Sequence, residues 1–233
     1  MSNYIIGDVH LSLGVDKPMD IYGGEWIGYV DKLRQALSAL TPDDTLVLAG
    51  DISWGMRLTE TLPDFMFLTQ HCKAEIILVK GNHDYWWTTV AKMNAFLSEQ
   101  GLVNLKILHN NAYLVDGKAI CGTRGWFYEE DKGADAQNEK VFLRELGRLR
   151  ASLEAGRRLG AEELICCLHY PPLYEGYRCD PIVELMGEYG VRRCYYGHLH
   201  GQACGRAIEG VYRGIDYTLV SADHVGFTPV KIL

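Results

Sequence analysis

The feature that most constrains the fold is a unit of strand, polar turn and helix that occurs three times in the first half of the chain. Residues 4–6, 46–49 and 76–79 are short apolar runs of the kind that form buried strands. Each run ends in a glycine and a polar residue, namely Gly7-Asp8, Gly50-Asp51 and Gly81-Asn82. Apolar residues at helical spacing follow each turn, which predicts parallel βα units. All three polar turns then lie on one edge of the sheet, where ligands bind in open α/β folds.

The second half has a different pattern. Residues 105–115 and 118–122 are predicted to form two strands around Asp116-Gly117, a common hairpin turn. Residues 129–140 are predicted to be an exposed loop before a long helix, and the tail has the period-2 pattern of antiparallel strands. We therefore predict an α/β fold with parallel βα units first and mixed or antiparallel strands second. The length of 233 residues suits a single domain over residues 1–233.

Composition narrows the class of protein. Hydrophobic residues make up 48% and charged residues 23% of the chain, which is ordinary for a soluble globular protein. The net charge of −7 argues against an extended nucleic-acid surface, which needs a basic face. No apolar run is long enough to span a membrane. The seven cysteines are odd in number and contain no Cys-x-x-Cys pair, so we expect reduced thiols and a cytoplasmic protein.

Polar side chains with metal-binding chemistry recur at five predicted strand ends. They are Asp8, His10, Asp51, Asn82, His83, His169, His198 and His200. One such histidine alone is more often a core or loop residue than a ligand, but chance does not explain the same placement at five strand ends. In Asp8-x-His10 and His198-x-His200, alternate residues of an extended segment point to one side.

The types of donor indicate the metal. A mixture of imidazole, carboxylate and amide ligands is typical of sites for Mn²⁺, Fe²⁺ or Zn²⁺, and it differs from the soft thiolate type of metal site. Without His83 there remain seven candidate ligands, which exceed the needs of one four-coordinate ion and suit two divalent ions that share a ligand. Two such ions form a clamp for displacement at phosphorus, and their remaining positive charge favours an anionic phosphate ester.

The series Asp-x-His, Gly-Asp, Gly-Asn-His-Asp, a lone downstream histidine and Gly-His-x-His resembles the calcineurin-like metallophosphoesterases from Asp8 to His200. The resemblance implies a four-layer α/β/β/α sandwich. It implies Asp8, His10, Asp51 and His200 on one metal ion. It places Asp51, Asn82, His169 and His198 on the other, with Asp51 bridging.

The same resemblance implies hydrolysis of a phosphomonoester or phosphodiester by a metal-bridging hydroxide, with His83 assisting the leaving group. A histidine suits that role because its unperturbed pKa lies near neutrality. The alternatives are a nuclease, a non-catalytic metal-binding scaffold of the same fold, and a nucleotide-binding α/β protein without metals. The acidic composition argues against a nuclease, and the complete ligand set argues against a non-catalytic scaffold. The absence of a Gly-x-Gly-x-x-Gly motif argues against a nucleotide-binding protein without metals.

The substrate is the least determined part of the prediction. We expect a small phosphorylated molecule, with nucleotides among the candidates, and no membrane partner; the oligomeric state stays open. Arg57 and Arg124 lie shortly after predicted strands and could bind a phosphate, or they could form structural ion pairs. Aromatic residues beside the ligands could line a leaving-group pocket or pack the loops together. Residues 11–28 and 127–138 are the loops expected to shape the mouth, and Asp84 has no assigned role.

Overall fold

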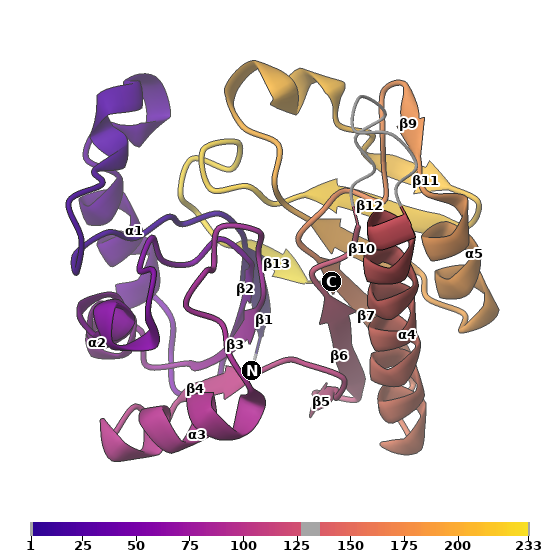
Figure 1. Cartoon of the computed structure of the whole chain (residues 1–233), viewed down its shortest axis with the longest axis horizontal. Coiled ribbons are helices and arrows are strands. Elements are labelled where there is room, and N and C mark those ends of the chain that lie inside the picture. Colours follow the sequence, from indigo (N-terminus) through magenta and orange to yellow (C-terminus); the bar gives the residue numbers. More distant parts are fainter. Residues whose placement is uncertain (1, 127–135, 233) are drawn as a thin grey trace.

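A computed structural model describes residues 2–126 and 136–232, with the side chains of residues 136–138 left out. Two β-sheets face each other, and helices cover the outer face of each (Figure 1). The first sheet and its helices come from the N-terminal half together with the last strand. The second sheet and its helices come from the rest of the chain. The architecture is the α/β/β/α sandwich that the resemblance to the calcineurin-like metallophosphoesterases implies.

The first sheet contains the three predicted βα units. Its strands run in the order β13 (Val230–Ile232), β1 (Asn3–Ile6), β2 (Thr45–Ala49), β3 (Glu75–Val79) and β4 (Leu105–Ile107). Strands β1 to β4 are parallel, and β13 closes the edge antiparallel to β1. Its outer face carries helices α1 (Tyr29–Ser38), α2 (Leu62–His71) and α3 (Val90–Glu99). The aliphatic runs form these strands because both faces of the sheet are covered.

The second sheet is mixed. Its order is β11 (Gly210–Tyr212), β12 (Ile215–Leu219), β10 (Arg193–Tyr196), β7 (Glu163–Leu168), β6 (Lys118–Thr123) and β5 (Tyr113–Val115). The four central strands are parallel, and the two edge strands pair antiparallel. Helices α4 (Ala136–Arg158) and α5 (Asp180–Glu188) pack on its outer face, and a small hairpin joins β8 (Leu173–Tyr174) to β9 (Tyr177–Arg178).

Three details differ from the prediction. Residues 105–115 are not one strand, because the chain turns at Asn110, which has a positive φ of 62°, and passes from β4 in one sheet to β5 in the other. The tail is not wholly antiparallel, since β12 runs parallel to β10. Residues 136–140 belong to α4 rather than to the predicted loop 129–140, whose earlier residues lie outside the described part of the chain.

The core lies in three apolar layers. The middle layer joins the two sheets and contains Ile5, Val47 and Ile77 from the first sheet and Ile120 and Ile165 from the second. The outer layers lie under the two sets of helices. Alternate residues of the central strands therefore face the opposite sheet or the helices. The sandwich holds the ends of β1, β2, β3, β7 and β10 close together, and the polar turns follow these ends.

Candidate metal centre

The structure brings all seven predicted metal ligands to one edge of the sandwich. Two groups form there, each with one ligand atom per residue and all of these atoms within 4.8 Å of one another. Asp8, His10 and His200 make the first group, which joins the ends of β1 and β10. Asp51, His169 and His198 make the second, which joins the ends of β2, β7 and β10. The grouping requires both sheets, since neither sheet carries a full set alone.

Asp51 lies between the two groups. Its Oδ2 is 3.7 Å from His10 Nε2 and 3.5 Å from His169 Nε2, one histidine from each group. Asn82 reaches the second group through its Oδ1, which is 2.6 Å from His169 Nε2. In the first group, His200 Nε2 is 3.3 Å from Asp8 Oδ1. One carboxylate oxygen therefore faces both groups, as a bridging ligand must.

The donor atoms at the centre are buried and lack hydrogen-bond partners. Asp8 Oδ1, Asp51 Oδ2 and His200 Nε2 are all in this state. Such atoms are rare in folded proteins because an unpaired buried polar group costs about 1–3 kcal/mol. A cation would satisfy all three atoms together, so the residues present fit a metal centre.

The backbone at the centre is strained. Asp8, His10, Asp51 and His198 have positive φ angles of 57°, 43°, 49° and 73°. This left-handed region costs a non-glycine residue free energy, and such residues cluster at functional sites. The four conformations persist because the surrounding sandwich fixes them.

Two glycines make room for the carboxylates. A Cβ at Gly81 would collide with the backbone and carboxylate of Asp51, and a Cβ at Gly197 would collide with the carboxylate of Asp8. At these strand ends the backbone of one strand lies directly against a ligand from another. Glycine is required there for close approach.

Further side chains, outside the predicted set, orient the ligands. Asp8 Oδ2 accepts the His198 N–H at 2.9 Å and the Ser221 hydroxyl at 3.0 Å. Asp223 Oδ1 is 2.9 Å from His200 Nδ1, which leaves His200 Nε2 facing Asp8. Such outer partners fix the tautomer and direction of a ligating histidine. Ser221 and Asp223 follow the apolar run 217–220. The same pattern that identified the other candidates, a polar residue just after a predicted strand, could therefore have identified these two.

Asp84, which has no role in the sequence prediction, holds the turn after β2 in place. Its buried carboxylate accepts the backbone N–H groups of Gly81 (2.7 Å), Asp51 (3.0 Å) and Ile52 (2.9 Å). It also accepts the indole N–H of Trp86 at 3.0 Å. These bonds tie the β2 turn to the β3 turn, so Asp84 positions Asp51 and is not itself in either ligand group.

The protonation of the centre reflects an excess of buried negative charge. Burial raises the pKa of Asp51 to about 8, and the charge of Asp8 adds to this. Burial would also raise the pKa of Asp8, but His200 and the other histidines outweigh it and hold that pKa well below its usual range. His200 has its pKa raised to about 10 because Asp8 and Asp223 outweigh the effect of burial. Without metal the centre therefore keeps protons that a bound cation would displace.

The remaining histidines of the centre favour the neutral form that binds metal. Burial is the main cause, and it lowers the pKa of His10, His169 and His198, the last to about 3. A neutral imidazole offers a lone pair to a cation, so these histidines need not lose a proton on binding at neutral pH.

His83 lies beside the centre and outside both ligand groups. Its backbone N–H donates to Asp51 Oδ1 at 2.7 Å, and its half-buried ring is 5.7 Å from the ring of His10. The ring of Trp54 contacts it at 4.6 Å and stacks on His10 at 4.8 Å with an angle of 19°. Trp54 therefore packs against two histidines of the site.

The two arginines suggested for substrate binding are not brought into the centre. Arg124 is 3.5 Å from the buried carboxylate of Glu145, which also pairs with Arg148 and accepts the Thr123 hydroxyl. This ion pair is the structural alternative considered for Arg124. Arg57 is exposed at the start of a 3₁₀ turn, Leu58–Thr61, and a phosphate-binding role for it stays a prediction.

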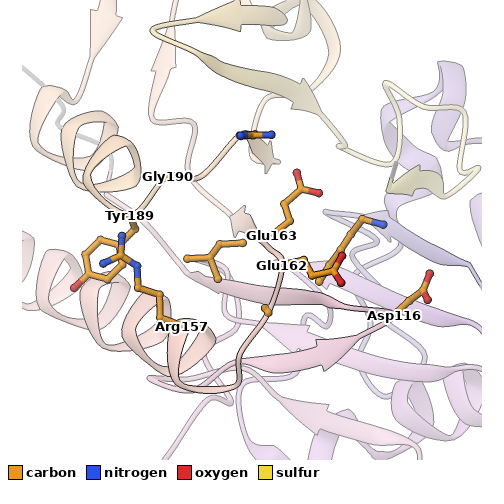
Figure 2. Close-up of a pocket in the computed structure, with 10 residues that line it drawn as sticks. Asp116, Arg157, Glu162, Glu163, Tyr189 and Gly190 are labelled. Carbon is orange, nitrogen blue, oxygen red and sulfur yellow. The ribbon is translucent and has the colours of Figure 1, made fainter.

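A cavity of about 440 Å³ lies at the opposite edge of the second sheet, next to the first residues of β6 and β7, Lys118 and Glu163 (Figure 2). Its charged side chains include two that are engaged by neighbours. Arg157 packs over the Tyr189 ring at 4.3 Å, and Glu163 pairs with Arg193 at 2.6 Å. Among the described residues that line it, the cavity offers no cluster of donors comparable to the metal centre.

The sequence pattern of the calcineurin-like phosphoesterase family matches residues 1–202. The chain belongs to this family. The match covers both ligand groups, and together they support metal-dependent phosphoester hydrolysis at a dinuclear centre. No curated protein matches the chain at a significant level.

Two solved structures share the calcineurin-like fold of this chain. A protein of unknown function, AQ665 from Aquifex aeolicus, has 15% identity and a TM-score of 0.52, over 99% of this chain and 95% of that one. TT1561 of Thermus thermophilus has 15% identity and a TM-score of 0.56, over 100% and 99% of the two chains. At this identity the likeness concerns the fold alone.

Within residues 2–126 and 136–232, no helix combines the length and the apolar character that crossing a membrane requires.

Proposed function

We propose that the chain hydrolyses a small phosphoester, a monoester or a diester, with two divalent metal ions. In this proposal Asp8, His10, Asp51 and His200 hold one ion. The second is held by Asp51, Asn82, His169 and His198. The observation that carries the proposal is Asp51 Oδ2, which is buried, has no hydrogen-bond partner and lies within 3.7 Å of one histidine from each group. Mn²⁺, Fe²⁺ and Zn²⁺ suit this mixture of imidazole, carboxylate and amide donors.

The metal ions would supply Lewis acidity and an activated water for displacement at phosphorus. The chain's own contribution is to fix the ligands in one arrangement and to exclude bulk water from buried carboxylates. His83 would donate a proton to the leaving oxygen, since its side chain lies beside the centre without belonging to a ligand group. Its backbone bond to Asp51 Oδ1 fixes the distance between the acid and the bridging carboxylate.

The substrate and the setting of the enzyme are proposed on chemical grounds. A small phosphorylated substrate, nucleotides included, suits two cations in an otherwise acidic chain. All seven cysteines are free thiols and six of them are buried, which supports a reducing, cytoplasmic location.

The test begins with protein stripped of metal and reloaded separately with Mn²⁺, Fe²⁺ and Zn²⁺. We expect about two ions per chain by elemental analysis, and hydrolysis of 4-nitrophenyl phosphate or bis(4-nitrophenyl) phosphate with at least one metal. Two bound ions with no hydrolysis of either ester would favour the non-catalytic scaffold. A single bound ion under saturating metal would overturn the dinuclear assignment.

A further inference from the structure

A groove of about 820 Å³ lies beside the metal centre. His10, His83 and His200 line it, so the groove includes the place where the reacting phosphoryl group would lie. Its volume is in the range of pockets that hold small organic ligands. A phosphoryl group bound to the metals would leave most of this space for the rest of the substrate.

One wall comes from the 3₁₀ turns Met19–Tyr22 and Gly24–Trp26 and contains Met19, Tyr22 and Trp26. The wall is fixed to the centre, because the Trp54 indole N–H donates to Met19 Sδ at 3.3 Å and Trp26 contacts the rings of His10 and His200. This confirms that the predicted mouth-shaping loop 11–28 lies at the site. Its counterpart 127–138 lies mostly outside the described residues.

Glycines keep the groove open. Gly23, Gly24 and Gly201 line it, and a Cβ added at any of them would meet nothing within 4 Å. Backbone and apolar side chains therefore make up much of the surface that a ligand would touch. Such a surface binds through shape and apolar contact.

The charged residues of the groove already have partners. Glu25 pairs with Lys32 at 3.2 Å, and His224 pairs with Glu209 at 3.6 Å. Both oxygens of Asp223 are engaged, one with His200 and one with the Gly201 N–H. Among the described residues that line the groove there is no lysine or arginine. The Lys17 ammonium lies 3.6 Å from the centre of the Trp54 ring, which lines the groove, so this cation already has an aromatic partner. A second anionic group on the substrate would find no cation on the lining itself and two carboxylates near it.

The turn that forms the wall also exposes large apolar side chains. Tyr22, which lines the groove, is 67% exposed, and its neighbour Ile21 is 75% exposed. Exposed apolar side chains that gather beside a site mark a surface that contacts a ligand or partner. The position of Tyr22 on the groove wall favours a ligand within the groove.

We infer that the groove binds the leaving group of the substrate, and that this group is uncharged, largely apolar and about the size of a substituted aromatic ring or a nucleoside. The inference rests on the proposed function, because it places the phosphoryl group at the metals. It assigns Tyr22 as a specificity-determining residue. It also disfavours substrates with several phosphates and oligonucleotides, whose further charges would lie in the groove near Glu25 and Asp223.

The test measures binding of phosphonates, which are not hydrolysed, to the metal-loaded full chain by calorimetry. Methylphosphonate, benzylphosphonate and 4-carboxybenzylphosphonate share the metal-binding group and differ in the part that would enter the groove. We expect benzylphosphonate to bind at least about tenfold more tightly than methylphosphonate, because its ring is removed from water. The added carboxylate should remove most of this gain.

Variants assign the gain to the groove. Tyr22→Ala should reduce the preference for benzylphosphonate several-fold and leave methylphosphonate binding unchanged, while Tyr22→Phe retains the preference. Ile21→Ala is the matched control, since Ile21 lies on the same turn and is similarly exposed but does not line the groove. We expect it to bind all three phosphonates as the unchanged chain does.

Equal binding of methyl- and benzylphosphonate would overturn the inference, as would a preference that Tyr22→Ala does not alter. Self-association or sedimentation with phosphatidylcholine–phosphatidylglycerol vesicles that depends on Tyr22, without any phosphonate preference, would assign the apolar side chains to a protein or lipid surface instead. If the inference fails in either way and the chain still hydrolyses 4-nitrophenyl phosphate, the proposed function remains intact. Failure of the proposed function shows differently, as loss of both hydrolysis and methylphosphonate binding.

Discussion

The carboxylate of Asp84 accepts the backbone N–H of Asp51 at 3.0 Å, and through this bond one strand end holds the proposed bridging residue of another. Asp84 comes from the turn after β3, and Asp51 comes from the turn after β2. The positive φ of Asp51 is kept by this contact and by the neighbouring bond to the Ile52 N–H. The metal centre thus depends on a residue that is not itself one of the proposed ligands.

Replacing Asp84 by Ala should destabilise the chain and weaken metal binding together. The N–H groups of Gly81, Asp51 and Ile52 would lose their acceptor in a buried place, and the free energy of unfolding should fall by about 3 kcal/mol. Denaturant unfolding of the metal-free protein measures this change. Asp43→Ala, at an exposed aspartate, serves as the control. A loss of less than about 0.5 kcal/mol in the Asp84 variant would contradict the positioning role.

His83→Ala and Asp51→Asn should separate catalysis from metal binding. His83→Ala should lower kcat by about 10²-fold or more, with metal content near that of the unchanged chain, because the residue is in neither ligand group. Asp51→Asn should lose metal, since an amide cannot supply the charge of a bridging carboxylate. Elemental analysis and steady-state kinetics on the same preparations measure both. Equal metal loss in the two variants would refute the separation.

The metal-free chain should become less stable as the pH rises from about 7 to 8.5. The folded-state pKa values of Asp51, about 8, and His200, about 10, both lie above the ordinary values of 3.8 and 6.5. In this window the folded chain binds more protons than the unfolded chain. Stability therefore falls with pH, by at most about 1.4 kcal/mol per pH unit for each group. His10, His169 and His198 have lowered pKa values and contribute below this window.

Urea unfolding in the presence of a chelator, repeated at several pH values, measures how the free energy of unfolding changes with pH. Saturating Mn²⁺ should reduce this slope, because metal displaces the same protons in advance. A smaller slope should remain, since burial also raises the pKa values of the Cys72, Cys121 and Cys167 thiols. Asp51→Asn in the chelator should show a shallower slope than the unchanged chain. A slope that is the same with and without metal would show that these two groups do not set it.

Lys17→Met should move the alkaline limb of the kcat/KM profile to higher pH. Burial, His169 and Lys17 lower the pKa of His83, and the Lys17 ammonium lies 3.6 Å from the centre of the Trp54 ring beside it. Removing this positive charge raises the pKa of His83. An acid that must be protonated is lost as pH rises through its pKa, so the loss then occurs at higher pH.

Methionine suits this experiment because it keeps an apolar contact with the Trp54 ring. Lys92→Met, at an exposed lysine on α3, removes the same charge from another surface and should leave the limb in place. A limb that moves to lower pH in Lys17→Met, or does not move, would contradict the expectation that Lys17 lowers the pKa of the proposed acid, His83.

Much of the fold follows from local patterns. The three turns Gly7-Asp8, Gly50-Asp51 and Gly81-Asn82 predict three parallel βα units, and the structure contains them as β1 to β3 with α1 to α3. Thr89, a residue type favoured at helix starts, is the N-cap of α3, and its hydroxyl accepts the Lys92 N–H. The break at Asn110 was not predicted, because a left-handed residue between two apolar runs leaves no periodic signal.

The sequence by itself determined which residues have metal-binding chemistry and that each follows a strand. That information is local, since a glycine, a polar residue and an apolar run are neighbours in the chain. Only the tertiary structure decided that Asp8 lies with His200 and that Asp51 lies between His10 and His169. These pairs come from different strands, and the first pair joins the two sheets. The tertiary structure also gave Asp84, Asp223 and the groove beside Tyr22 their roles. Hydrogen bonds and cavities between distant segments depend on how the sheets pack, and packing leaves no mark on the local sequence.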